Sequence, residues 1–268
     1  MNPKAVSRNP IATRSMLASA MLWLMLMLML MSISLHAFAQ VAGTVTQVSG
    51  PMMAKKADGK VKILSVKSEV ESGDTLITEK NTYALVKFID DSEITLKPAT
   101  TFVVEKFTYQ ADQPDADQAS FNLVKGGLRS LSGLLGKRNK EKFSLKTPVA
   151  TIGIRGTFFT AEYVGAGSYT VPRSPSSPAV TPAGTTLAPG LYTSVTTGQI
   201  AVSNPAGTLT FAAGQFGYTS SFTMPPILVP TNPGLPFKPP ASFSINGAGA
   251  SPSTTASGKS GNVDCEVR

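Results

Sequence analysis

The sequence is poor in the side chains that most enzymes use for acid–base and nucleophilic chemistry. Its 268 residues include one histidine, one tryptophan and one cysteine. His36 and Trp23 both lie in the first 39 residues, which have the composition of an export leader. Without that leader no histidine remains to act as a general base. The sequence also lacks a Gly-x-Ser-x-Gly motif, a phosphate-binding loop and a metal-ligand cluster. We therefore predict a non-enzymatic protein with no catalytic residues, no metal and no cofactor.

Carboxylates are the only remaining candidates for acid–base chemistry. Asp90 and Asp91 are adjacent, so on a strand they would point to opposite faces. Asp112, Asp115 and Asp117 lie in a polar segment that reads as an exposed hairpin loop, and their spacing is not that of an EF-hand calcium loop. These acids are interpreted as solvated turn residues.

The N-terminus resembles a secretory signal. Three basic residues and no acidic one precede an apolar run from Met16 to Leu35, and Ala37-Phe38-Ala39 then forms a small-x-small cleavage pattern. We predict a signal peptide over residues 1–39, with cleavage after Ala39. The run is also long enough to span a bilayer, so an uncleaved membrane anchor is the alternative. Both alternatives place the rest of the chain outside the cytoplasm, in the periplasm or cell envelope.

The charge and the single cysteine narrow the choice of partners. Loss of the three basic leader residues would reduce the formal net charge from +8 to +5, which is too small an excess to indicate a nucleic-acid binder. Cys265 has no second cysteine with which to form an internal disulfide. It is either an inert thiol near the C-terminus or one half of an intermolecular bridge.

The remaining sequence predicts an all-β fold. Short apolar or alternating runs such as Val41–Val48, Tyr83–Ile89 and Thr101–Tyr109 are separated by Gly, Asp and Asn turns. Glu93–Lys97 alternates with period two, which places Ile94 and Leu96 on one face. Short strands at this spacing are typical of a β-sandwich, a β-roll or a short β-solenoid, and the three remain open.

Composition also suggests the domain boundaries. We predict one β domain over residues 40–221, interrupted at about 165–190 by a flexible insertion rich in Pro, Ser, Thr, Ala and Gly. Residues 222–268 are rich in Pro, Gly and Ser and are predicted to form a disordered tail, because such a sequence buries too little apolar area to offset its ordering entropy.

Five segments in order resemble the FecR domain family. Val70–Thr78 is similar to its Gly-Asp step, Tyr83–Pro98 to its paired strands, and Phe121–Leu128 to its next glycine step. Phe143–Phe159, which contains TPVATIGIRGT, resembles the most specific family signature, and Val195–Gln215 resembles the closing step. The resemblance covers about residues 41–218 and implies an envelope module for binding and signalling.

The resemblance is incomplete at the N-terminus. FecR signalling proteins carry a cytoplasmic region that regulates a sigma factor, whereas only about 15 residues precede the apolar run here. Asp91-Ser92 also stands where the family prefers Asp-Gly. The resemblance therefore implies a stand-alone exported form without the sigma-regulating region.

Arg155 is the first candidate contact residue. It lies in the sequence Ile154-Arg155-Gly156-Thr157, and its planar guanidinium suits a carboxylate or phosphate group of a partner. The alternative is a structural role, in which Arg155 pairs with a carboxylate of its own domain, such as Asp74 or Asp90, and the neighbouring glycines form a tight corner.

A basic stretch over residues 125–146 is the second candidate. Lys137, Arg138 and Lys140 are its proposed partner contacts, and Glu141 is its only acid. Such a stretch favours an anionic envelope polymer, lipid headgroups or an acidic envelope protein as partner. The alternative is an ordinary solvated loop. The other basic residues of the stretch are Lys125, Arg129, Lys142 and Lys146.

Three functions follow from these patterns. The first is an exported FecR-like binding or interaction module that senses or relays a signal in the bacterial envelope. The second is a structural or surface-associated envelope protein, tethered by its Pro-rich tail. The third is a hydrolase of cell-wall or polysaccharide material, which the missing histidine disfavours but which a carboxylate mechanism leaves open.

Overall fold

A computed structural model describes residues 21–25, 27, 40–165, 169–170, 186–233 and 237–243. The chain divides into two units, Met1–Ala39 and Gln40–Arg268. In the first unit residues 21–25 and 27 are helical, and the rest of the predicted signal peptide lies outside the described residues. Within the described part of the chain, no helix has both the length and the apolar character needed to cross a membrane.

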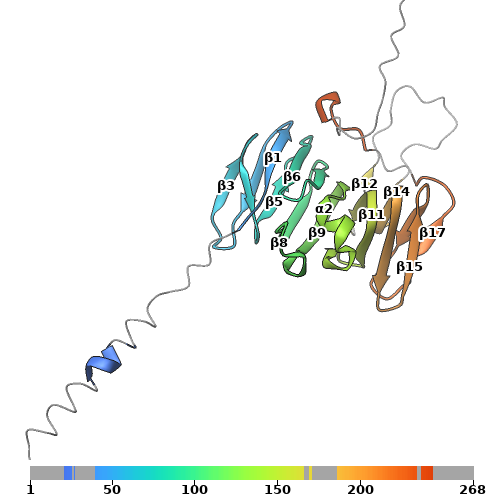
Figure 1. Cartoon of the computed structure of the whole chain (residues 1–268). Coiled ribbons are helices and arrows are strands. Elements are labelled where there is room, and N and C mark those ends of the chain that lie inside the picture. Colours follow the sequence, from blue (N-terminus) through green and yellow to red (C-terminus); the bar gives the residue numbers. More distant parts are fainter. Residues whose placement is uncertain are drawn as a thin grey trace, which may run out of the picture. The chain divides into compact units, whose positions relative to one another are not determined.

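The second unit is built almost entirely of strands, which run through the domain in chain order (Figure 1). Its short helices are η1 (Pro114–Ala116), α2 (Leu134–Arg138), η2 (Lys140–Lys142) and η3 (Ala241–Phe243). The strands are β1 (Val41–Val48), β2 (Met52–Lys55), β3 (Val61–Leu64), β4 (Glu69–Glu71), β5 (Thr75–Thr78), β6 (Ala84–Phe88), β7 (Glu93–Leu96), β8 (Thr101–Thr108), β9 (Gln118–Leu131), β10 (Phe143–Lys146), β11 (Thr151–Val164), β12 (Tyr169–Thr170), β13 (Thr186–Leu187), β14 (Gly190–Asn204), β15 (Gly207–Ala212), β16 (Phe216–Thr219) and β17 (Ile227–Val229).

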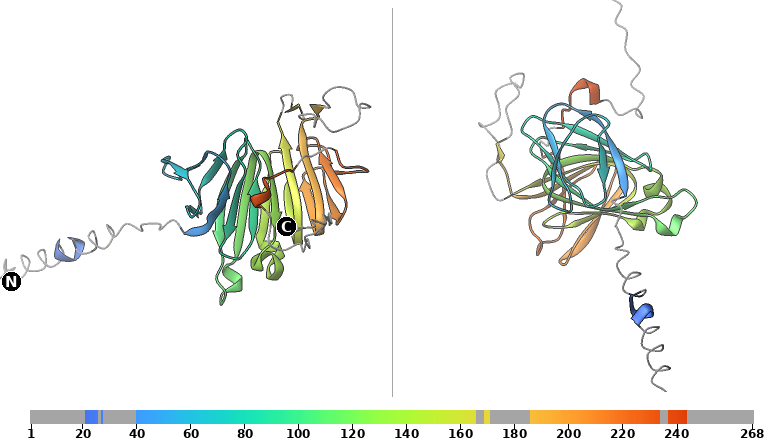
Figure 2. Two further views of the ribbon diagram at one scale, coloured as in Figure 1. Left: turned by 90° about the horizontal axis from the view of Figure 1, so that it is seen from above. Right: turned by 90° about the vertical axis from the view of Figure 1, so that its left-hand side faces the viewer.

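Fifteen of these strands form one hydrogen-bonded sheet that folds over into two facing layers. Layer 1 has the order β3-β2-β5-β8-β9-β10-β11-β14-β15, and layer 2 has the order β4-β1-β6-β7-β9-β11-β14-β16-β17. The long strands β9, β11 and β14 appear in both layers because each contributes one half to each. Figure 2 shows the folded sheet from two further sides. The all-β prediction is confirmed, and the arrangement is a two-layered roll.

Glycines mark the places where the three long strands pass from one layer to the other. Gly126 in β9, Gly156 in β11 and Gly198 in β14 have φ angles of +85°, +63° and +76°. A residue with a Cβ atom is strained in this left-handed region, whereas glycine enters it freely. The predicted tight corner beside Arg155 is therefore confirmed at Gly156.

The core lies between the two layers. Phe88 of layer 2 packs on Phe107 and Phe121 of layer 1, with ring centroids 4.8 and 5.3 Å apart. Phe102 stacks on Phe121 at 5.3 Å. Ile94 and Leu96 are both buried, as the alternation in their strand predicts. The two layers thus share one continuous aromatic and aliphatic core.

Parts of the predicted insertion and tail have regular structure. Within 165–190, β12 pairs with β13 as a two-stranded ribbon, and residues 166–168 and 171–185 lie outside the described residues. Within the predicted tail, β17 pairs with β16 at the edge of layer 2, and Phe243 is buried. The disordered-tail prediction therefore does not hold for these two segments, because each docks apolar side chains or main chain on the domain. Cys265 and the rest of 244–268 lie outside the described residues.

Candidate functional site: a basic pocket and its supporting clamp

The short helix α2 is held in place by a buried aspartate. The side-chain carboxylate of Asp90 accepts a hydrogen bond from the Leu135 backbone N–H at 3.2 Å. The backbone carbonyl oxygen of Asp90 accepts a second one from the Leu134 N–H at 2.8 Å. A Cβ atom on Gly133 would lie 2.3 Å from the Asp90 carbonyl oxygen, so only glycine allows this close approach. Asp90 is thus a helix cap, which satisfies backbone donors that a helix start leaves unpaired.

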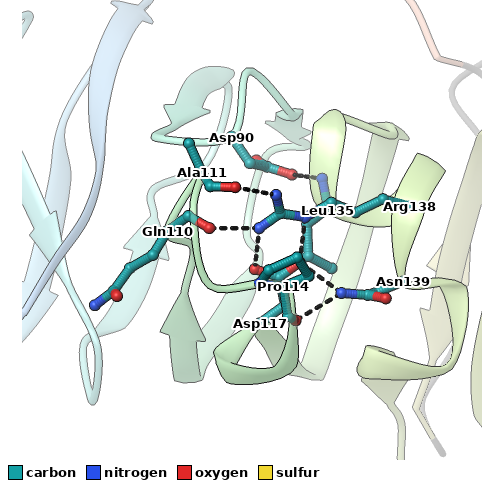
Figure 3. Close-up of polar contacts among 8 residues, drawn as sticks. All are labelled: Asp90, Gln110, Ala111, Pro114, Asp117, Leu135, Arg138 and Asn139. Atoms are coloured by element: carbon teal, nitrogen blue, oxygen red, sulfur yellow. Dashed lines mark hydrogen bonds and ion pairs between the residues drawn. The ribbon is translucent and has the colours of Figure 1, made fainter.

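The C-terminal end of α2 is fastened by Arg138 (Figure 3). Its Nε and Nη2 atoms donate to the two carboxylate oxygens of Asp117, each at 2.7 Å, and its other bonds reach the carbonyl oxygens of Ala111 and Gln110 at 2.8 and 2.6 Å. Asn139 adds a 2.9 Å hydrogen bond to the same carboxylate. Such a two-point arginine–carboxylate bond fixes geometry as well as charge. We call Arg138, Asp117 and Asn139 the clamp.

The clamp revises two sequence-based interpretations. Asp117, read as a solvated loop residue, has a side chain that is 0% exposed. Arg138, proposed as a partner contact, is instead occupied inside the domain, where it also lies over the Tyr109 ring at 4.5 Å. Its role is to hold the 110–117 loop against α2 and η2, and so to shape the surface beside them.

We expect Asp117→Asn to lower the free energy of unfolding by about 2 kcal/mol at pH 7, because the charged hydrogen bonds of the clamp are lost. Hydrogen bonds from Arg138 hold the pKa of Asp117 below its ordinary value. The clamp therefore stabilises the fold fully above the unfolded pKa of about 4, and this contribution disappears as the pH falls through the lower folded pKa. Urea unfolding at pH 7 and pH 3 would measure both effects. The prediction is contradicted if the difference in unfolding free energy between wild type and Asp117→Asn is the same at pH 7 and at pH 3.

An open pocket of about 450 Å³ lies next to the clamped segment. Lys140 and Glu141 come from η2, Phe143 from β10, and Arg155 from β11. Its remaining lining residues are Gly153, Ile154 and Ala201. Lys140 and Arg155 are exposed, and Phe143 is half-buried. The pocket thus offers two cations, one anion and an aromatic ring to a ligand.

Arg155 does not form the ion pair within its own domain that the sequence offered as an alternative to partner binding. Asp74 pairs with Lys56 at 2.9 Å, and Asp90 caps α2. No ion pair involves Arg155 among the residues that the structure describes. The proposed pairing of Arg155 with Asp74 or Asp90 is therefore wrong, and its guanidinium is free to face the pocket.

The comparisons with known proteins bear directly on this part of the chain. The family described as FecR protein matches residues 74–171, which include the clamp and most of the pocket. The chain carries a FecR domain. No curated protein matches the sequence.

Two crystal structures of a "putative anti-sigma factor" from Parabacteroides distasonis are similar to the chain. The first has 13% identity and a TM-score of 0.41, and the comparison covers 58% of each chain. The second has 11% identity and a TM-score of 0.40, with the same coverage of 58% on both sides. The chain thus spans less than two thirds of the length of these proteins.

The FecR domain distributes the basic residues of 125–146 over several surfaces. Lys146 pairs with Glu105 at 2.8 Å, and Arg129 lies on the outer side of layer 2 between the rings of Phe158 and Phe237. Lys137 is exposed on α2. The stretch therefore does not form one continuous patch, and of the four proposed contact residues Lys140 and Arg155 are the pair that the fold brings to one pocket.

The FecR domain also contains a buried ion pair that sequence reasoning missed. Lys97 Nζ lies 2.6 Å from Glu162 Oε2, and the two side chains are 6% and 4% exposed. Gly127 of β9 lies between them in the sheet, and a Cβ atom there would come within 2.8 Å of Lys97 Cδ. No local pattern signals this pair, because its members are 65 residues apart.

Proposed function

We propose that this chain is an exported envelope protein whose FecR domain binds an anionic partner through the basic pocket and thereby senses or relays a signal. The N-terminal sequence supports export, and the FecR match supports a role in signalling. Binding rather than catalysis is proposed, because the pocket holds no histidine and one carboxylate.

The position of Lys140 and Arg155 carries the proposal. Both cations line one open pocket, and neither takes part in an ion pair within the described residues. Exposed cations that are not neutralised internally attract carboxylate or phosphate groups, and the planar guanidinium can bind them at two points. Phe143 provides apolar area beside these two cations. A protein surface with both acidic and apolar side chains can contact Lys140, Arg155 and Phe143 together, so we propose this partner class.

Reversal of both charges tests the pocket. We expect Lys140→Glu/Arg155→Glu to reduce retention of the full chain in washed cell envelopes at low ionic strength by at least about tenfold, since roughly 1.4 kcal/mol of lost binding already gives that factor. Lys62→Glu/Lys80→Glu is the matched control, because both lysines are exposed and lie outside the pocket. Retention should also fall as salt is added, because salt screens exposed charges.

Two outcomes would count against the pocket. Equal retention of both double variants would show that the pocket charges do not hold the partner. Loss of retention only on deletion of residues 244–268 would instead favour the structural envelope role, in which the tail is the tether.

A further inference from the structure

A second surface, on the outer side of layer 2, has features that the proposed function does not use. Gln47, Leu85, Thr95 and Arg129 lie side by side across β1, β6, β7 and β9. Their neighbours along the strands, such as Val86 and Ile94, belong to the core, so these four side chains point outward. Nevertheless Leu85 is 5% exposed and Thr95 is 0% exposed. Another part of the molecule must cover this face.

The covering segment is Phe237–Phe243, drawn in red in Figure 2. The ring of Phe237 lies 4.5 Å from the Arg129 guanidinium carbon and 5.9 Å from the Tyr83 ring. The Phe243 ring lies 6.3 Å from the Tyr83 ring, and Phe243 is 3% exposed. Phe158 lies 5.4 Å from the Arg129 guanidinium, which is therefore held between two aromatic rings.

The cover matches the apolar features of this face but not its polar ones. Gln47 Oε1, Glu93 Oε2, Thr95 Oγ1 and Arg129 Nε are buried without a hydrogen-bond partner among the described residues. Glu93 attracts Arg129 electrostatically but forms no ion pair with it in the described structure. Buried polar groups without partners are costly, and proteins normally satisfy them.

The sequence of the cover explains the mismatch. Phe-Lys-Pro-Pro-Ala-Ser-Phe contains no carboxylate, and its two prolines lack backbone N–H donors. The segment contacts Tyr83 through its two phenylalanine rings, which supply apolar area. A segment attached by two rings and few hydrogen bonds is the kind that opens locally without unfolding the domain.

We propose that this face is a peptide-binding site which Phe237–Phe243 covers in cis, and that its ligand is a segment of another protein with an aromatic residue next to a carboxylate. The aromatic ring would take the place of Phe237 between Tyr83 and Arg129. The carboxylate would accept hydrogen bonds from the Arg129 guanidinium, which the cover leaves unpaired. Such a ligand satisfies both the apolar part of the face and the Arg129 guanidinium, so it can displace the cover.

Two synthetic peptides test the ligand chemistry. One has the sequence of residues 235–244, and the other is identical except for Lys238→Glu, which places a carboxylate next to Phe237. Fluorescence anisotropy would measure their binding to the full chain and to its Phe237→Ala/Phe243→Ala variant, in which the cover is weakened. We expect the acidic peptide to bind this variant at least tenfold more tightly than the natural peptide, and to bind wild type at least tenfold more weakly than the variant.

Arg129→Met in the uncovered variant gives the specific control, because it keeps the apolar stem but removes the guanidinium. The preference for the acidic peptide should disappear in this triple variant. Equal affinity of the two peptides for a folded Phe237→Ala/Phe243→Ala variant would overturn the proposal, and so would no binding at all. Circular dichroism would establish that each variant is folded.

Hydrogen exchange on the wild-type chain provides a second test that does not depend on a variant. If the acidic peptide displaces the cover, saturating peptide should increase the exchange rate of the amides of residues 237, 238 and 241–243. Unchanged exchange at millimolar peptide would show that the segment is a permanent part of the domain and would overturn the proposal.

Discussion

Replacement of Lys97 by methionine should lower the free energy of unfolding by about 3–5 kcal/mol, because it leaves the Glu162 carboxylate buried without its ion-pair partner. Both side chains are almost fully buried, and their 2.6 Å contact is the shortest ion pair in the described residues. Urea unfolding monitored by circular dichroism at pH 7 would measure the loss. Glu162→Gln, which leaves the ammonium group unpaired, should show a loss of similar size.

The double variant Lys97→Met/Glu162→Leu distinguishes a buried charge from a simple packing defect. Because neither charge remains, we expect it to recover most of the stability lost in either single variant. If the losses of the two single variants instead add, the pair does not act as a unit and the interpretation fails.

The second large effect is expected where β14 crosses between the layers. At Gly198 an added Cβ atom would lie 2.2 Å from the Gly156 carbonyl oxygen, in addition to the strain of a φ angle of +76°. We expect Gly198→Ala to destabilise the domain by about 3 kcal/mol, from left-handed backbone strain together with steric overlap. Thermal and urea unfolding of the purified chain would measure it.

Gly156→Ala is the matched control for this prediction. Gly156 also has a positive φ, +63°, but no atom lies within 4 Å of its added Cβ. In Gly156→Ala, backbone strain alone should lower the free energy of unfolding by about 1 kcal/mol. If both alanine variants lost the same stability, close contact between the two crossing strands would not be the cause.

The fold class was predictable from sequence because strand patterns are local. Alternation in Glu93–Lys97 identified Ile94 and Leu96 as core residues, and the TPVATIGIRGT segment identified the family and the corner at Gly156. The folding of one sheet into two layers was not predictable, because it depends on which distant strands share hydrogen bonds. Pairing of β7 and β9 joins residues more than 30 positions apart.

The candidate site was predicted only in part from the sequence, and the incorrect predictions have a common cause. Lys140 and Arg155 were identified from their charge and do line one pocket. Arg138 and Asp117 were identified as exposed residues, yet they bind each other across 21 positions. Composition shows that a segment is polar but not whether a specific partner lies opposite. The aromatic residues of the Pro-rich segment were overlooked for the same reason, since Phe243 is buried only by contact with distant strands.

The sharing of β9, β11 and β14 between the layers affects how the domain can come apart. In the N-terminal part each strand from β1 to β8 belongs to a single layer, so one layer can peel away from its edge a strand at a time. In the part that contains the pocket, β9, β11 and β14 run through both layers, so the layers there can separate only if these strands bend open at their glycine corners or lose hydrogen bonds along their length. The N-terminal edge is therefore expected to open before the region that contains the pocket.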